Sequence, residues 1–331
     1  MVKRLAALAV ALVMAVSVLC GCTERPPEMI ERTSFLFDTI VTIKLRSCED
    51  AEIVLSEAFD LCQQYHRLFD RFDPESDISR INSSGGAPCE VSEETVRLIR
   101  AGLEYSELSE GRFDITCGRV TELWDFSAEN PSLPSPDELT AALQTIGWEA
   151  VSVDGNVITV PEGTELDLGG IAKGYIADRI AEFLVEKGID SAIVNLGGNV
   201  RVLGTRNGQP FRVGIQSPFH EGSTIGQVNV TDCSVVTAGS YQRCFELDGT
   251  VYHHILDLSD GVPAASGLAS VTVICESSAR ADALATICFL MGAEDAIDFI
   301  ESMDAVEAIM IKDTGELRLT SGAMAIFSMN D

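Results

Sequence analysis

The sequence contains few basic residues, few aromatic residues and no internal repeat. Its 331 residues include 23 Lys and Arg against 51 Asp and Glu, a formal net charge of −28. A field of this sign repels polyphosphate, so we expect no nucleic-acid partner. Aromatic residues make up only 6%, and the lack of a 20 to 50 residue period argues against solenoids and propellers. The 46% of apolar residues suffice for one globular unit with one or two lobes.

The sequence also lacks an apolar run long enough to cross a bilayer comfortably. Lys3 and Arg4 precede an uncharged run, residues 5–19, whereas a stable span needs about twenty apolar residues. A charged start and a short apolar run are typical of an export signal. The run ends in Leu19-Cys20-Gly21-Cys22, which resembles the bacterial lipobox, whose last Cys receives diacylglycerol.

We therefore expect a signal peptide over residues 1–21 and lipidation at Cys22. Residues 22–32 are then a polar tether, and residues 33–331 form the functional domain. This arrangement places the protein outside the cytoplasmic membrane, on the periplasmic side if the host has two membranes. An ordinary cleaved signal or an uncleaved anchor is the alternative.

Cysteine spacing excludes a metal cluster. Eight cysteines follow Cys22, and no two of them form a Cys-x-x-Cys pair. Cys62, Cys275 and Cys288 lie in apolar runs, where a thiol behaves as a small hydrophobe. Disulfides are compatible with export, but the sequence does not pair them.

The pattern of apolar residues predicts an α+β fold with a largely antiparallel sheet. We expect a strand over 35–43, an amphipathic helix from about Val54 to Leu68, and a helix that Ser92 caps and that ends near Leu108. Ser135 and Glu138 form a capping box that opens a short helix. Further helices are expected at 170–187 and 277–291, and hairpins at 151–160, 244–256 and 308–319, the last closing the chain. Rossmann winding does not fit this order.

Paired glycines at a strand-to-helix junction form the first candidate site. Gly169 and Gly170 precede a predicted helix that carries Lys173 in its first turns. Glycines allow a close approach of backbone to ligand, and a helix N-terminus offers free N–H groups and partial positive charge to a phosphate. The segment matches neither the Walker nor the dinucleotide pattern. A tight connection without a ligand is the alternative.

Two adjacent histidines form the second candidate. His253 and His254 precede Asp257 on a predicted strand, where neighbouring side chains face opposite ways, so only one can serve a given site. Histidine is the side chain best matched to proton transfer near neutral pH, although a lone strand histidine is often structural.

The third candidate is a carboxylate and a hydroxyl on one helix face. Asp282 and Thr286 are four residues apart among alanines and bulky apolar residues. Their oxygens, with backbone carbonyls, are the hard ligands that suit Mg²⁺ beside a phosphate. A hydrogen-bonded Asp–Thr pair or a solvated helix face is the alternative.

Together these segments resemble the motifs of the FAD:protein FMN transferase (ApbE) family. In chain order the matching stretches are Asp77-Ile78-Ser79-Arg80-Ile81-Asn82, Gly111-Arg112-Phe113-Asp114 with Leu123-Trp124-Asp125-Phe126, Asp167 to Tyr175, Asn195-Leu196-Gly197-Gly198-Asn199, His253 to Asp257, and Asp282 to Thr286. The resemblance covers nearly all of the chain after the signal peptide. It implies a two-lobed, T-fold-like architecture.

The resemblance also implies an activity, a metal and site roles. The family moves the FMN half of FAD onto a Thr or Ser hydroxyl of an acceptor flavoprotein, releasing AMP, with Mg²⁺. His254 would then be the general base, with Asp282, Thr286 and a backbone carbonyl at Ala172 on the metal. The FAD-binding residues would be Phe72, Gly169, Gly170, Lys173 and Asp257.

This sequence departs from the family motifs at three places, which affect the recognition of flavin and acceptor rather than the binding of the metal. The usual Thr-Ser-Gly reads Thr237-Ala238-Gly239, and Asp-Pro-x-Thr-Gly reads Asp257-Leu258-Ser259-Asp260-Gly261. Phe72 stands where relatives often have Tyr, which keeps a stacking face and loses a hydroxyl. An FAD pyrophosphatase that uses water, and a non-catalytic flavin-binding or solute-binding lipoprotein, are the alternative functions.

Overall fold

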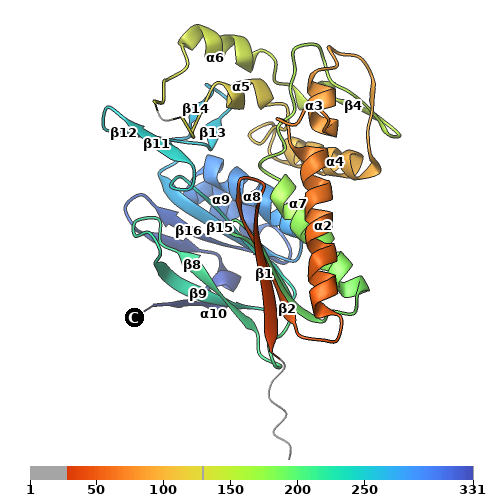
Figure 1. Ribbon diagram of the computed structural model, residues 1–331. Coiled ribbons are helices and arrows are strands. Elements are labelled where there is room, and N and C mark those ends of the chain that lie inside the picture. The colour runs from red at the N-terminus through yellow and green to blue at the C-terminus, as the bar shows by residue number, and fades with distance from the viewer. Residues whose placement is uncertain (1–27, 129, 331) are drawn as a thin grey trace, which may run out of the picture.

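The computed structural model describes residues 28–128 and 130–330, and its centre is a large antiparallel sheet (Figure 1). The sheet has eight strands in the order β1-β2-β6-β7-β10-β15-β16-β17. Their bounds are β1 Met29–Leu36, β2 Thr39–Arg46, β6 Ser191–Leu196, β7 Asn199–Gly204, β10 Ser234–Gly239, β15 Leu268–Cys275, β16 Val306–Lys312 and β17 Leu317–Leu319. Every pairing in this sheet is antiparallel, which confirms the predicted α+β class.

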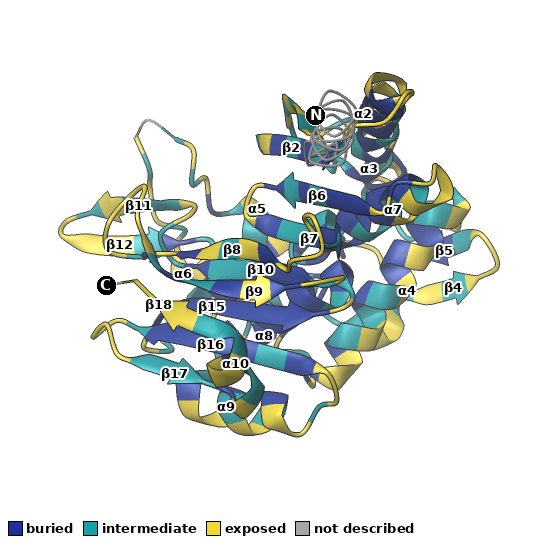
Figure 2. Ribbon diagram, turned by 90° about the horizontal axis from the view of Figure 1, so that it is seen from below, coloured by how far each residue is buried: buried dark blue, intermediate teal, exposed yellow. Residues whose placement is uncertain are grey.

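Four helices cover one face of the sheet and bury the main core. They are α2 Ala51–Phe69, α7 Ala172–Glu186, α8 Ser278–Met291 and α9 Ala293–Glu301. All eight residues of β15 are buried, because helices cover one face of this strand and a second sheet covers the other (Figure 2). Most of α8 is buried as well, so its alanines allow close contact with both α7 and the sheet.

A small three-stranded sheet covers part of the opposite face. It consists of β8 Phe211–Gln216, β9 Thr224–Val230 and β18 Phe327–Met329, with α10 Ser321–Ile326 beside it. Phe211 and Val228 pack there against Val202 and Ile309 of the large sheet.

A second lobe lies over one end of the large sheet, at the top of Figure 1. It contains α3 Asp77–Asn82, α4 Glu93–Leu108, α5 Gly118–Glu122, α6 Pro136–Leu143, the 3-10 turn Trp148–Ala150, β3 Cys89–Glu90, β4 Ser152–Asp154 and β5 Val157–Thr159. Two hairpins, β11 Cys244–Leu247 with β12 Thr250–His253 and β13 Leu256–Asp257 with β14 Val262–Pro263, join it to the sheet. Trp124 closes this junction by donating to the Gly261 carbonyl at 2.9 Å.

The capping predictions are confirmed. The Ser92 hydroxyl accepts the Thr95 N–H at 3.1 Å, and Ser135 and Glu138 form both bonds of the capping box. The predicted helices at 170–187 and 277–291 begin and end within about two residues of α7 and α8.

Three expectations are corrected at segment ends. The single strand over 35–43 is a hairpin, because Phe37 and Asp38 both adopt φ +54° and reverse the chain. Its first strand begins at Met29, inside the expected tether. The hairpin of β16 and β17 does not close the chain, since α10 and β18 follow it.

The predicted signal peptide and Cys22 lie outside the described residues. Within 28–128 and 130–330, no helix combines the length and apolar composition needed to cross a membrane. The eight cysteines of this part are free thiols. Burial raises the pKa of Cys62, Cys275 and Cys288 to about 12, so these thiols pack as apolar groups.

Candidate functional site

The glycine turn before α7 is held by side chains from distant parts of the sequence. The Asn82 amide donates to the Leu166 carbonyl at 3.0 Å and accepts the Leu166 N–H at 2.7 Å. The Asp167 carboxylate accepts the Gly169 N–H at 2.8 Å. A Cβ on Gly170 would lie 2.7 Å from Phe113 Cε2, so this position requires glycine. Three of the sequence motifs therefore meet at this turn.

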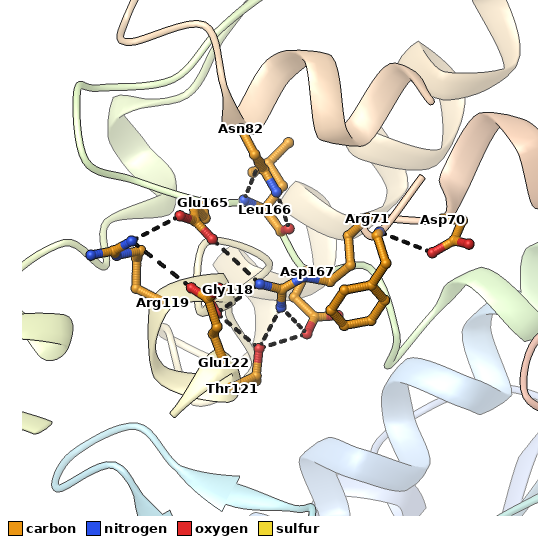
Figure 3. A network of polar contacts seen from close by, with 11 residues as sticks. Asp70, Arg71, Asn82, Gly118, Arg119, Thr121, Glu122, Glu165, Leu166 and Asp167 are labelled. Carbon is orange, nitrogen blue, oxygen red and sulfur yellow. Dashed lines mark hydrogen bonds and ion pairs between the residues drawn. The ribbon is translucent and has the colours of Figure 1, made fainter. Parts of the chain in front are cut away.

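Arg71 joins the turn to the second lobe (Figure 3). Its guanidinium donates to Asp167 at 2.9 Å, to Glu165 at 3.3 Å and to the Thr121 hydroxyl at 2.7 Å. Burial alone would raise the pKa of Asp167, but the Arg71 charge, the Thr121 hydroxyl and the Gly169 N–H hold it below its ordinary value. Asp167 is therefore ionised when it orients the turn.

No motif in the sequence indicates Arg71 or Thr121 as a site residue. The available signal was the pair of acids, Glu165 and Asp167, next to a turn expected to bind an anion. Partly buried acids at such a place need a cationic partner. Nothing in the linear sequence shows which arginine supplies it, because Arg71 is 96 residues from Asp167.

Gly174 brings α7 against the first turn of α8. A Cβ at this position would lie 2.3 Å from the Ser278 carbonyl oxygen, so only glycine permits the contact. The Gly174 N–H donates to the Asp282 carboxylate at 2.9 Å. Burial raises the pKa of Asp282, while the charge of Lys173 and this N–H oppose the rise. A buried carboxylate thus lies beside the residues that follow the glycine turn.

Asp282 and the two other predicted metal ligands supply oxygen atoms of the kind that a hard divalent cation binds. Thr286 is half-buried one helical turn after Asp282, on the same face of α8. Ala172 starts α7 two residues before Gly174, so its backbone lies at the same helix contact. The described residues contain no group of three or more His, Cys, Asp or Glu side chains able to hold a metal. The predicted ligand set is of another kind, namely one carboxylate, one hydroxyl and one carbonyl.

His254 lies within electrostatic range of the same lysine. Its pKa falls to about 4, because burial disfavours the charged imidazole and the charges of Lys173 and Arg243 add to this effect. The imidazole is therefore neutral at pH 7 and able to accept a proton. Within the described part of the chain its Nδ1 atom is buried without a hydrogen-bond partner.

Asn199, the first residue of β7, lies beside the Asp282 carboxylate. Ser278 donates to the Asn199 carbonyl oxygen, and the Asn199 side chain helps to oppose the rise that burial causes in the pKa of Asp282. Buried polar atoms are normally satisfied, so the Nδ1 atom of His254 marks a place where a bound molecule can supply a hydrogen bond.

The sequence model of the ApbE family matches residues 37–310, which is most of the chain. The chain belongs to the ApbE family. Two curated relatives are each 33% identical to it and are named FAD:protein FMN transferase. The Treponema pallidum relative matches over 92% of this chain and 90% of its own length, and a Klebsiella pneumoniae relative over 90% and 94%.

Solved ApbE structures have the same fold. The crystal structure of the ApbE protein of Thermotoga maritima is 32% identical, with a TM-score of 0.85 over 90% of this chain and 99% of that one. The flavin transferase ApbE of Vibrio cholerae is 27% identical, with a TM-score of 0.81 over 91% and 100%. This agreement confirms the expected ApbE-like fold.

The two histidines of the ApbE motif differ in their surroundings. His253 ends β12, and its ring contacts the Ala264 carbonyl through Nε2 at 3.2 Å and accepts the Ile255 N–H through Nδ1 at 3.3 Å. Both ring nitrogens are thus engaged within the protein. His254 follows the end of the strand, so β12 is shorter than the sequence predicts.

Two predicted FAD-binding residues, Phe72 and Asp257, lie outside the glycine turn. Phe72 is 77% exposed, and the Arg71 guanidinium carbon lies 5.4 Å from its ring centroid, so a free aromatic face is held beside the turn network. Asp257 accepts the Ser259 N–H at 2.9 Å and stabilises the turn between β13 and β14. A role for Asp257 in FAD binding stays a prediction.

Proposed function

We propose that this site transfers the FMN moiety of FAD to a Thr or Ser hydroxyl of an acceptor flavoprotein, with Mg²⁺ and with release of AMP. Membership of the ApbE family and the curated relatives make the chain a flavin transferase. Adjacent residues at the start of α7 connect the parts of the site: Lys173 donates to the Gly169 carbonyl at 3.3 Å, and the Gly174 N–H donates to the Asp282 carboxylate at 2.9 Å. Together with burial, the Lys173 charge also lowers the pKa of His254. One position thus lies near an anion-binding turn, a buried carboxylate and a neutral imidazole.

One bond forms and one bond breaks in the proposed transfer. The acceptor hydroxyl oxygen forms a bond to the FMN phosphorus, while the bond between that phosphorus and the bridging oxygen of the pyrophosphate breaks. AMP leaves with the bridging oxygen. The hydroxyl proton passes to the neutral imidazole of His254, so His254 is the proposed general base.

The glycine turn and the start of α7 bind the charged part of FAD in this proposal. Free N–H groups and the positive end of the helix favour a phosphate. The Lys173 ammonium, which donates to the Gly169 carbonyl at 3.3 Å, adds a full charge. Lys173 thus offers an anion a local positive charge in a protein whose formal net charge is −28.

Asp282, Thr286 and the Ala172 carbonyl are the proposed ligands of Mg²⁺. When bound, the metal draws charge from the pyrophosphate and stabilises departing AMP. The Gly174 N–H orients the Asp282 carboxylate for this role. Phe72 offers its exposed ring to the isoalloxazine.

The test is a single incubation of the protein with FAD, Mg²⁺ and a flavoprotein subunit that bears a target Thr or Ser. We expect the intact mass of the acceptor to rise by one FMN group and AMP to appear in equal amount. Equal AMP release without acceptor would instead indicate an FAD pyrophosphatase. FAD binding without product would indicate a non-catalytic flavin-binding protein.

We also propose that the protein is exported and anchored through a lipid on Cys22. The support is the short apolar run and the Leu-x-Gly-Cys ending. The six residues between Cys22 and Met29, where β1 begins, span at most roughly 25 Å. The enzyme can then reach acceptors that are themselves held in the membrane.

A further inference from the structure

A basic cavity lies at the opposite end of the large sheet from the site. It has a volume of about 370 Å³. Its lining includes three basic residues, Lys44, Arg206 and Arg212, and no acidic residue. In a chain with 23 basic and 51 acidic residues, such a lining is a local reversal of charge.

The cavity is built at the edge where the small sheet stops covering the large one. Its apolar surface comes from Met29 at the start of β1, Ile193 on β6 and Phe211 on β8. Lys44 is directly opposite Ile193 in the strand register. The three bases therefore surround an apolar surface, which favours a ligand with both an anionic and an apolar part.

The positions of the bases are fixed by the backbone. Arg206 and Gln209 exchange backbone hydrogen bonds of 2.9 and 3.1 Å across a two-residue turn, which holds Arg206 at the cavity rim. Lys44 pairs with Glu31 at 2.9 Å. Arg206 and Arg212 are exposed, and neither forms an ion pair with any residue in 28–128 or 130–330. Two uncompensated guanidinium groups suit a phosphate.

The cavity is separate from the catalytic groups. Ile193, the cavity residue on β6, lies three residues before Leu196, which pairs with Asn199 at the start of β7. Three residues of strand span about 10 Å, and neither Arg206 nor Arg212 is among the residues proposed to bind FAD or the metal. Changes at Arg206 and Arg212 therefore leave those residues in place.

From these observations we infer that the cavity binds the headgroup of an anionic phospholipid and orients the enzyme on the bilayer. Met29 lines the cavity and lies seven residues after Cys22, a reach of at most about 25 Å. The orienting role thus rests on the proposed anchoring, whereas lipid binding itself does not. A protein of net charge −28 is repelled by an anionic surface unless it presents its basic end.

Lipid binding is measured on the full chain in neutral detergent, by native mass spectrometry during titration with phosphatidylglycerol or phosphatidylcholine. Each basic side chain near an anionic surface contributes roughly fivefold to binding. The variant Arg206→Glu/Arg212→Glu should therefore bind phosphatidylglycerol at least about 25-fold more weakly. The parent should prefer phosphatidylglycerol, and added salt should reduce this preference.

The matched control is Arg67→Glu/Arg100→Glu, which changes the net charge equally at two exposed arginines on α2 and α4. It should bind phosphatidylglycerol like the parent, and both double variants should retain FMN transfer to a soluble acceptor. If the charge reversal lowers transfer, Arg206→Gln/Arg212→Gln replaces it in the titration.

Three outcomes would overturn the inference. One is equal phosphatidylglycerol binding by the parent and the cavity variant. Another is full competition by glycerol phosphate at the concentration of the lipid, which would assign the cavity to a soluble phosphate. The third is stronger binding of an acidic peptide than of phosphatidylglycerol. A lack of FMN transfer would leave the lipid titration unaffected, so failure of the proposed function is distinguishable.

Discussion

At the residue scale, burial changes what is expected of His254. An exposed histidine titrates near 6.5, and the sequence alone predicts a base with an ordinary pKa, so the rate would rise through pH 6 to 7. In the folded protein the pKa of His254 is about 4. Only the neutral imidazole accepts a proton, so the transfer rate should be level from pH 5 to 8 and fall below pH 4.

Substitution of His254 should separate chemistry from binding. We expect His254→Asn to lower kcat by about 10² to 10⁴-fold, the usual contribution of a general base, with little change in FAD affinity. The measurements are FMN transfer against pH and a parallel FAD titration. His253→Gln is the matched control, because glutamine can still donate to the Ala264 carbonyl as His253 does. A transfer rate that rises through about pH 6.5 in the parent, or a parent-like rate in His254→Asn, would contradict the assignment of His254 as the general base.

Asp282 allows a similar separation of metal binding from folding. Asp282→Asn keeps the acceptor for the Gly174 N–H but removes the charge, so the fold should persist. Transfer should fall at least about a hundredfold, and EDTA should stop the parent. The comparison is Asp178→Asn on α7, whose carboxylate accepts the Ser278 and Ala279 N–H groups of α8. Asp178→Asn should lose stability, and its FMN transfer should still depend on Mg²⁺. If Asp282→Asn unfolds and Asp178→Asn does not, Asp282 is a structural residue.

At the element scale, the glycine turn depends on Arg71. The side chains of Arg71, Glu165 and Asp167 are 13%, 20% and 21% exposed, so removing Arg71 leaves two largely covered carboxylates without a partner. Removing one partner of a fully buried pair costs about 3 to 5 kcal/mol, and partial solvation reduces this to roughly 2 to 3 kcal/mol for Arg71→Ala. Urea unfolding measures the loss.

The pH dependence of this loss has a definite sign. The folded-state pKa of Asp167 is depressed, so its contribution is present above the unfolded pKa of about 4 and disappears as the pH falls through the folded value. The difference between Arg71→Ala and the parent should therefore shrink at pH 3. Arg32→Ala, which removes an exposed pair with Glu52, should change stability by less than about 1 kcal/mol at either pH. An equal loss of stability in the two variants would contradict the proposal that Arg71 holds the glycine turn in place.

The contrast between local and distant contacts explains what could be predicted from sequence. The caps at Ser92 and Ser135 depend on residues three positions away, so the pattern is visible in the sequence. The hairpin at Phe37 and Asp38 was missed because neither residue typically adopts positive φ. Strand β18 was missed because three residues carry no periodic signal, and its position follows from pairing with β9, about 100 residues earlier.

The same distinction applies to the site. The glycine turn, the histidine pair and the Asp–Thr spacing are short patterns, so their residue types indicated chemistry directly. Arg71 and Asn82 act on the turn through contacts that span 96 and 84 residues. Burial of His254 is a property of the folded chain, which is why the direction of its pKa shift could not be read from the sequence.

At the scale of the whole molecule, the second lobe and the start of β1 lie at different ends of the large sheet (Figure 1). The proposed transfer site includes residues next to that lobe, whereas the lining of the basic cavity includes Met29, the first residue of β1. A chain anchored through residues that precede Met29 has its membrane end opposite the proposed transfer site. An acceptor held in the same membrane would then have to extend its target residue to the side of the enzyme that faces away from the lipid.

Anchoring itself is testable at Cys22. The parent should carry diacylglycerol, fractionate with membranes and enter the detergent phase, because the run over residues 5–19 is shorter than a stable span. Cys22→Ala removes the only acceptor atom for the lipid at that position. We expect this variant to keep its signal sequence or to be released, with a mass that lacks the lipid in either case.

Cys20→Ala is the control, since Cys20 lies two residues before the expected lipidation site and is removed with the signal peptide. It should be lipidated like the parent. Intact mass and phase partition distinguish the three proteins without any assay of FMN transfer. If Cys22→Ala is processed and fractionates as the parent does, the lipid assignment is wrong.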